Sequence, residues 1–269
     1  MRKRLQSMNF TSTQFHLHYI AQYKLIIKAN YSQDILYVLS NDGQVLVYMN
    51  YDNRNPTDAA LKLLSLPFQQ VFISIPYQNL TFIPDELYDS EDKDKYQEFM
   101  DNPTLPSKST SLDFLAIQAL FQYDVLLEQQ WRSLFPDAQF IPEFKLNLYL
   151  ARPHVPLQGE VLGVFSGDHC TDVFLFINGK FKFYNSFEVL TEEDLNYFIL
   201  NLLETFHVHA KVSKVLYANS QEKIDVKSQL ASFGNELIQI QSNQVMAEIA
   251  ELPKEITESY LIDLPTCVL

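Results

Sequence analysis

The stretch from Gly159 to Val208 constrains the fold more than any other part of this 269-residue chain. It contains four of the six glycines, which are Gly159, Gly163, Gly167 and Gly179. Apolar runs on both sides of Asn178-Gly179 predict a tight hairpin, because both residues tolerate positive φ. Thr191 followed by Asp194 predicts a capped helix, and the apolar residues after them recur at helical spacing. The expected local structure is a meander of three strands followed by an amphipathic helix.

The N-terminal part of the chain carries a weaker version of the same order of elements. Residues 23–28, 34–40 and 44–49 are rich in apolar residues and are predicted to form three strands, with the turn Asn41-Asp42-Gly43 before the third. A helix is expected to begin at residues 55–58. Residues 71–75 are predicted to form a short buried strand that ends at Pro76.

Two turn segments match when the halves of the chain are compared. Gly43 to Tyr48 and Gly179 to Tyr184 each have a turn glycine, a polar residue and then alternating apolar positions that end in tyrosine. A helix and a short apolar strand follow each segment, which indicates a duplicated βββαβαβ unit. The alternative is that two ordinary hairpins match by chance. The expected fold class is α/β with mixed sheets, in two similar subdomains around a cleft.

The rest of the first half carries two further predicted elements and the predicted boundary. Tyr123 to Phe135 places apolar residues at helical spacing, which predicts a helix with one apolar face. Residues 144–150 alternate apolar and polar side chains, which predicts a strand with one buried face. Pro153 and Pro156 mark the predicted boundary, so the subdomains are expected to span residues 1–155 and 156–269.

Composition excludes several classes of function. Hydrophobic residues make up 47% of the chain, which is enough for a sizeable core. The formal net charge of −13 opposes binding to nucleic acids and to anionic membranes. The sequence contains no apolar segment of the roughly 20 residues needed for a membrane span, so no membrane insertion is expected. Two distant cysteines, Cys170 and Cys267, indicate neither a disulfide framework nor a metal cluster and are typical of a cytoplasmic protein.

The duplicated unit resembles the actin-like, or ribonuclease-H-like, superfold. Residues 72–76 (FISIP) and 80–88 (LTFIPDELY), with the Gly159–Val208 meander and helix, carry the resemblance. They are similar to an uncharacterised bacterial family, domain-of-unknown-function family 3822, whose members look like actin-like ATPase folds. The chain also resembles the pilus-assembly and cell-division relatives of actin. The resemblance covers nearly the whole chain, although its motifs are apolar and degenerate.

This resemblance implies where a nucleotide site would lie. Actin-like ATPases place Asp-x-Gly at the first hairpin of each half, where the carboxylate acts through Mg²⁺ and water and backbone N–H groups meet phosphate oxygens. In the second half, Phe165 occupies the position of that carboxylate. Gly167 and Thr171 are what remains of the pattern, while Asp168 is shifted by three residues from the carboxylate position. Gly167, Asp168 and Thr171 form a candidate vestigial phosphate turn.

Other parts of the implied site are missing. The first-half turn, residues 29–33, has neither glycine nor carboxylate, and the chain has no Gly-Gly pair to approach adenosine. It has neither a P-loop nor a G-x-G-x-x-G sequence. We therefore expect no catalytic ATPase residues, no metal site, and neither ATP nor Mg²⁺ as a cofactor.

Further polar groups have a simpler interpretation than catalysis. Residues 168–172 bring Asp168, His169, Cys170 and Asp172 together, and a Cys–His nucleophile pair is conceivable there. Adjacent residues in a turn usually point apart, so a polar turn is the preferred interpretation. Two histidine pairs have i, i+2 spacing but no cysteine or acidic partner nearby, which disfavours a metal site; they are His16 with His18 and His207 with His209.

The expected function is binding or scaffolding without catalysis, with another protein as the partner. The basis for this expectation is the fold resemblance combined with the loss of the ATPase motifs. The alternative is a divergent nucleotide-binding ATPase or phosphotransferase that uses the cleft between the subdomains. A self-associating structural protein is a third hypothesis.

Overall fold

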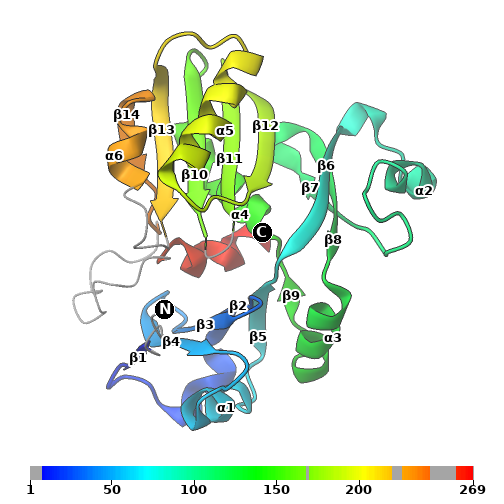
Figure 1. Ribbon diagram of the computed structural model, residues 1–269. Helices are drawn as coiled ribbons and strands as arrows, with labels where there is room; N and C mark the ends of the chain where they lie inside the picture. The colour runs from blue at the N-terminus through cyan, green and yellow to red at the C-terminus, as the bar shows by residue number, and fades with distance from the viewer. Residues whose placement is uncertain (1–7, 168–169, 220–225, 243–258, 269) are drawn as a thin grey trace. The chain divides into compact units, whose positions relative to one another are not determined.

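The computed structural model describes residues 8–167, 170–219, 226–242 and 259–268. They form a mixed α/β protein with one six-stranded, one five-stranded and one three-stranded sheet (Figure 1). None of the helices in these ranges is long and apolar enough to cross a membrane.

The strands are assigned to the three sheets as follows. The six-stranded sheet contains β1 (Met8–Thr11), β2 (Lys24–Lys28), β3 (Gln33–Leu39), β4 (Val45–Asp52), β5 (Gln70–Ser74) and β9 (Gln139–Phe140). The five-stranded sheet contains β10 (Glu160–Ser166), β11 (Thr171–Ile177), β12 (Lys180–Phe187), β13 (Val212–Asn219) and β14 (Gly234–Gln239). The three-stranded sheet contains β6 (Tyr77–Pro84), β7 (Lys108–Leu112) and β8 (Ile117–Tyr123).

The helices connect and cover these strands. The α-helices are α1 (Asp58–Leu64), α2 (Lys93–Gln97), α3 (Val125–Leu134), α4 (Glu143–Ala151), α5 (Glu192–Thr205) and α6 (Val226–Leu230). The 3-10 helices are η1 (Leu17–Gln22), η2 (Asp85–Leu87), η3 (Ser90–Asp92), η4 (Asp113–Leu115), η5 (Arg152–His154) and η7 (Ser259–Val268).

The two larger sheets repeat one topology. Five strands of the first sheet run in the order β4-β3-β2-β5-β9, and the second sheet runs β12-β11-β10-β13-β14. In each sheet the first three strands pair antiparallel as a meander, and the last two add in parallel. The helix after the meander is α1 in the first half and α5 in the second. The predicted duplication of a βββαβαβ unit is confirmed.

A β-bulge gives the two halves a common register. The pairing shifts between Val38 and Leu39 in β3, and between Leu175 and Phe176 in β11. In both halves the second pair from the bulge, on the side away from the hairpin turn, is aromatic: Tyr37 opposite Tyr48, and Phe174 opposite Tyr184. The ring centroids lie 5.0 Å and 5.7 Å apart. Bulges are structural features with a defined position, so the shared bulge supports residue-by-residue alignment of the halves.

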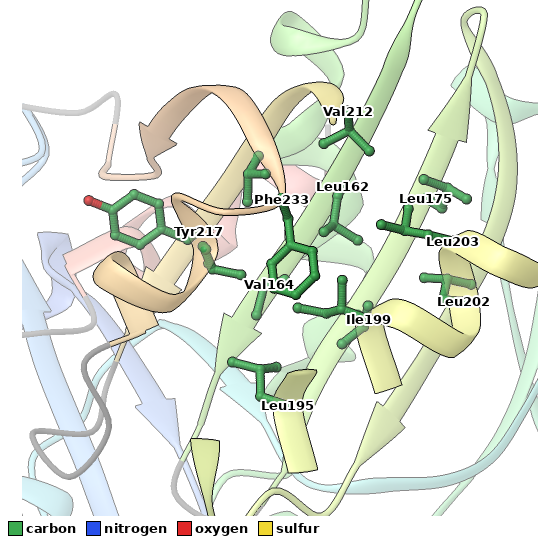
Figure 2. Close-up of a cluster of buried hydrophobic side chains, with 13 residues drawn as sticks. Leu162, Val164, Leu175, Leu195, Ile199, Leu202, Leu203, Val212, Tyr217 and Phe233 are labelled. Carbon is green, nitrogen blue, oxygen red and sulfur yellow. The ribbon is translucent and has the colours of Figure 1, made fainter. Parts of the chain in front are cut away.

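The core of the second half forms between α5 and one face of its sheet (Figure 1). Leu195, Ile199, Leu202 and Leu203 of α5 are buried against sheet residues that include Leu162 and Leu175 (Figure 2). At the start of α5, the Asp194 N–H donates to the Thr191 hydroxyl (3.2 Å) and the Thr191 N–H donates to the Asp194 carboxylate (2.8 Å). This is the predicted capping box, and the predicted apolar stripe is the face that packs.

The first half contains an insertion that the sequence did not predict as a unit. Strands β6, β7 and β8 form a separate antiparallel sheet between β5 and α3, whereas β13 and β14 of the second half have no such insertion between them among the described residues. Gln122 is fully buried at the end of β8, and its Nε2 donates to the carbonyls of Asn102 and Leu105. These bonds attach the loop before β7 to β8.

The prediction of a strand over residues 144–150 is wrong, because Glu143–Ala151 is the helix α4. Phe144, Leu146, Leu148 and Leu150 are all buried, as predicted, but Asn147 and Ala151 are buried too. A helix that is enclosed on most sides has no polar stripe of period 3.6. Its apolar residues can then alternate by chance and imitate a strand.

Two compact units divide the described residues. The first contains 8–146, 242 and 261–268, and the second contains most of 147–241 together with 259 and 260. The five-stranded sheet lies in the second unit and the other two sheets in the first. The predicted subdomain ranges, 1–155 and 156–269, stay a prediction.

Candidate functional site

Alignment on the shared bulge identifies the residues at the two positions implied for a metal-directing carboxylate. Strand β10 pairs Gly163 with Phe174, and Phe165 lies two residues after Gly163, just before the last residue of the strand. Strand β2 pairs Ile26 with Tyr37, so its residue equivalent to Phe165 is Lys28. The connections that follow, residues 29–32 between β2 and β3 and residues 167–170 between β10 and β11, are equal in length. Thus a lysine and a phenylalanine occupy the two positions.

Lys28 is a buried cation with a fixed partner. Lys28 is 6% exposed, and its ammonium nitrogen lies 3.0 Å from a carboxylate oxygen of Glu143, at the start of α4. Burial of a charge is costly unless the charge is paired, so this ion pair holds the end of β2 to α4. A positive side chain in this position repels a divalent cation. Sequence reasoning missed Lys28 because its equivalence to Phe165 depends on strand register.

Phe165 belongs to an aromatic cluster on the face of the sheet opposite α5. It is 2% exposed, and its ring meets Phe174 edge-on with centroids 5.3 Å apart. The ring of Tyr260 lies 5.9 Å away on the same cluster. Phe174 in turn stacks on Tyr184. An aromatic ring in such packing serves the core and offers no ligand to a metal.

The first-half turn is occupied by a carboxylate of the protein itself. The backbone N–H of Asn30 donates to Asp34 Oδ1 (3.0 Å), and Asn53 Nδ2 donates to the Asn30 carbonyl (2.6 Å). Burial raises the pKa of Asp34 to about 6, although hydrogen bonds from Asn30, Tyr51 and Asn53 lower it. The same burial and the neighbouring carboxylate raise the pKa of Tyr51. Asp34 therefore accepts the N–H that would otherwise be offered to a phosphate oxygen.

The sequence prediction for this turn was incomplete. Residues 29–33 contain no carboxylate, as predicted, but Asp34 lies one residue beyond and folds back over the turn. The sequence signal for this contact is Asp34 itself, an acidic residue near the start of an otherwise apolar strand. The alignment pairs Asp34 with Thr171 of the second half. The bond to Asp34 runs from the turn after β2 to the second residue of β3, so it can be recognised only when the bounds of β3 are known.

The second-half turn contains the predicted Gly167, Asp168 and Thr171. The Gly167 N–H donates to the Cys170 carbonyl (2.9 Å), and the buried Thr171 hydroxyl donates to the Ser166 hydroxyl (3.4 Å). Asp168 and His169 lie outside the described residues. The candidate phosphate turn therefore stays a prediction, with two of its three residues bonded within the turn.

Asp172 is the carboxylate that the structure places beside Phe165. The two residues are directly opposite in the β10–β11 pair. Asn147 Nδ2 donates to Asp172 Oδ2 (2.8 Å) and to the Tyr184 hydroxyl (2.9 Å), and the Ser186 hydroxyl donates to Asp172 Oδ1. Asp172 thus joins the start of the second unit to its sheet. Sequence reasoning grouped it with the turn, but its contacts are with β12 and α4.

The remaining predicted groups do not form a metal centre in the described part of the chain. No group of three or more His, Cys, Asp or Glu side chains there could hold a metal ion. The rings of His207 and His209 have centroids 6.2 Å apart, and His16 contacts Tyr19 instead of forming a site with His18. Cys170 is exposed, and His169, with which a nucleophile pair is conceivable, lies outside the described residues.

The profile of the family described as "Protein of unknown function (DUF3822)" matches residues 12–237. No curated protein matches the chain. A solved structure from Bacteroides thetaiotaomicron, a protein with actin-like ATPase fold and unknown function, is similar over 84% of this chain and 93% of its own, with 18% identity and a TM-score of 0.67.

A second solved structure is similar over a larger part of the chain. It is the PilM–PilN type IV pilus biogenesis complex, in which the matched chain is covered over 98% and this chain over 91%, with 11% identity and a TM-score of 0.54. Identities this low establish the fold alone. The fold is the actin-like ATPase fold, as the sequence resemblance predicted.

Proposed function

Because the chain belongs to the DUF3822 family of unknown function and has the actin-like ATPase fold, we propose that it is a non-catalytic binding or scaffold protein. The single observation that carries the proposal is the pair Lys28 and Phe165. The resemblance to actin-like ATPases implies, at each of these two positions, a carboxylate that acts through Mg²⁺. One is a buried cation paired with Glu143, and the other is an aromatic core residue.

The occupied turns support the same proposal. Phosphate binding at such turns needs backbone N–H groups that point outward and have no partner within the protein. The N–H of Asn30 donates to Asp34, and the N–H of Gly167 donates to Cys170. We regard Gly167, Asp168 and Thr171 as the vestige of a phosphate turn. We propose that the protein uses neither ATP nor Mg²⁺ as a cofactor.

The proposed partner is another protein. The PilM–PilN structure is by its name a complex, so one chain with this fold associates with another protein. The net charge of −13 opposes association with nucleic acid. We further propose a cytoplasmic protein, because both described cysteines are free thiols and a reducing compartment keeps them so.

Nucleotide binding and hydrolysis test the proposal. ATP at about 100 times its Kd would stabilise the folded protein by about 2.7 kcal/mol. We expect no shift of the thermal unfolding midpoint with about 5 mM ATP and Mg²⁺, and no phosphate release above that of buffer. A metal-dependent turnover that Asp168→Ala abolishes would overturn the proposal and favour a divergent ATPase or phosphotransferase.

A further inference from the structure

The outer face of α5 carries a short apolar stripe with an acidic residue at each end. Tyr197 is 64% exposed and Leu200 is 58% exposed, although both lie in the helix that forms the core of the second unit. Glu193 and Glu204 are exposed at the two ends. These four residues have the spacing i, i+4, i+7 and i+11, so they lie on one side of the helix. We call them the α5 stripe.

The stripe is the face of α5 that the core does not use. Leu195, Ile199, Leu202 and Leu203 point into the sheet in Figure 2 and are buried. The α5 stripe lies on the opposite side of the helix, which folding therefore leaves in water. A polar face is the usual outer side of such a helix, so two large exposed apolar residues in one stripe indicate a binding surface.

The ends of the stripe are fixed by local bonds. The capping box of Thr191 and Asp194 holds the first turn, and the Thr205 hydroxyl donates to the Asn201 carbonyl in the last. Beside the stripe, Asn196 and Glu192 are both bonded to Gln229 of α6. The surface is thus a preformed helix of about three turns, roughly 16 Å from Glu193 to Glu204.

The charge around the stripe identifies the kind of partner that would fit. Residues 188–205 contain five acidic residues, Glu188, Glu192, Glu193, Asp194 and Glu204, and no lysine or arginine. A second copy of the chain is a poor occupant, since its own stripe would set Glu against Glu and both copies carry a net charge of −13. A helix with two apolar residues flanked by lysine or arginine complements both the apolar centre and the acidic ends.

We propose that the α5 stripe is the docking surface for a basic amphipathic helix of a partner protein. This inference rests on the proposed function, because it specifies where the proposed protein partner binds. Tyr197 supplies an amphipathic ring and Leu200 an aliphatic surface, which are suited to a groove between the partner's apolar side chains. Glu193 and Glu204 set the orientation and favour association through charge.

The test uses the full chain and a defined probe. The probe is a labelled synthetic peptide of about 18 residues, made of leucine and lysine with leucines at i, i+3 and i+4. A scrambled peptide of the same composition, with no apolar face, is its control. Affinities are measured by fluorescence anisotropy for the wild type, for Tyr197→Ser/Leu200→Ser and for Leu126→Ser. Leu126 is a matched control, because it is an exposed leucine (78%) on another helix, α3.

The expected result is selective loss of binding. The double variant should bind the amphipathic peptide at least about 10-fold more weakly than the wild type, while Leu126→Ser binds unchanged. Glu193→Lys/Glu204→Lys should also weaken binding and should reduce its dependence on salt between about 50 and 300 mM. Thermal unfolding midpoints should stay within a few degrees of the wild type, because all of these side chains are exposed.

Two outcomes would overturn the inference. If the double variant binds as well as the wild type, the peptide binds elsewhere and the α5 stripe is not the docking surface. If the wild type does not prefer the amphipathic peptide to the scrambled one, the proposed partner chemistry is wrong. Neither outcome bears on the proposed absence of ATPase activity, which the nucleotide assays test separately.

Discussion

The backbone N–H of Asn30 donates a 3.0 Å hydrogen bond to the carboxylate of Asp34, which closes the first-half turn with a side chain of the following strand. In the aligned turn of the second half the equivalent N–H, that of Gly167, donates to the Cys170 carbonyl. The two turns thus satisfy the same donor in different ways.

Asp34 should make the stability of the protein depend on pH. Its pKa is raised from 3.8 to about 6 in the folded state, so the folded protein binds this proton more tightly than the unfolded chain does. The contribution of Asp34 is therefore most favourable below pH 3.8 and is lost as the pH rises through about 6. The loss at neutral pH is about 3 kcal/mol, at 1.36 kcal/mol per pKa unit.

The variant Asp34→Asn isolates this effect, because the amide can still accept the Asn30 N–H. Between pH 4 and pH 7 its free energy of unfolding should rise relative to that of the wild type by about 2–3 kcal/mol. Urea unfolding at several pH values measures the difference. Asp52→Asn, at the exposed end of β4, controls for the general loss of an acidic charge. Parallel pH curves for Asp34→Asn and the wild type would contradict the prediction.

A carboxylate placed at position 165 should destabilise the second unit. Phe165→Asp removes a buried ring from its contacts with Phe174 and Tyr260 and buries a charge opposite Asp172. We expect a loss of at least about 4 kcal/mol in the free energy of unfolding. Phe165→Leu, which keeps an apolar side chain, should cost far less. Denaturant unfolding compares the two, and a Phe165→Asp protein with the stability of the wild type would disprove the account.

Any side chain at position 163 should lower the free energy of unfolding. A Cβ atom built on Gly163 would lie 2.0 Å from Cζ of Phe174, the residue directly across the strand pair. Gly163→Ala should therefore cost about 1–3 kcal/mol by overpacking. Phe174→Leu in the same chain should recover part of this loss, and a double-mutant cycle measures the coupling. Strictly additive effects would show that the close approach of the ring to the glycine is not the cause.

The two thiols should differ in reactivity. Cys170 is exposed, whereas Cys267 is buried, and burial raises the pKa of the Cys267 thiol to about 12. The thiolate is the reactive form, so a thiol reagent at neutral pH should modify one cysteine in the native protein and both in denaturant. Modification of the exposed Cys170 should be fast and that of the buried Cys267 slow. Cys170→Ser should therefore abolish the fast phase of modification and leave the slow phase. Rapid modification of Cys267 in the native state is the contradicting result, and mass spectrometry would detect it.

The sequence by itself determined the local plan of the second half. Asn178-Gly179 predicted the hairpin, and both residues have positive φ in the structure. Thr191 and Asp194 predicted the capping box, and the period of 3.6 predicted which face of α5 packs. These features are local, so each can be recognised from residues within one or two turns. The matching turns Gly43 and Gly179 then predicted the duplication, because repeated order survives where individual residues do not.

Only the tertiary structure decided the rest. It showed that Lys28 aligns with Phe165, that Asp34 closes its own turn and that residues 143–151 form a helix. The bond of Asp34 spans only four residues, but it depends on where β3 begins. The other two facts depend on partners far apart in the chain: strand register, burial on most sides, and a counter-ion, Glu143, 115 residues from Lys28. Local sequence carries no signal for a partner at that distance. For this reason the fold and the position of Phe165 could be predicted from the sequence, whereas Lys28 and the bond of Asp34 could not.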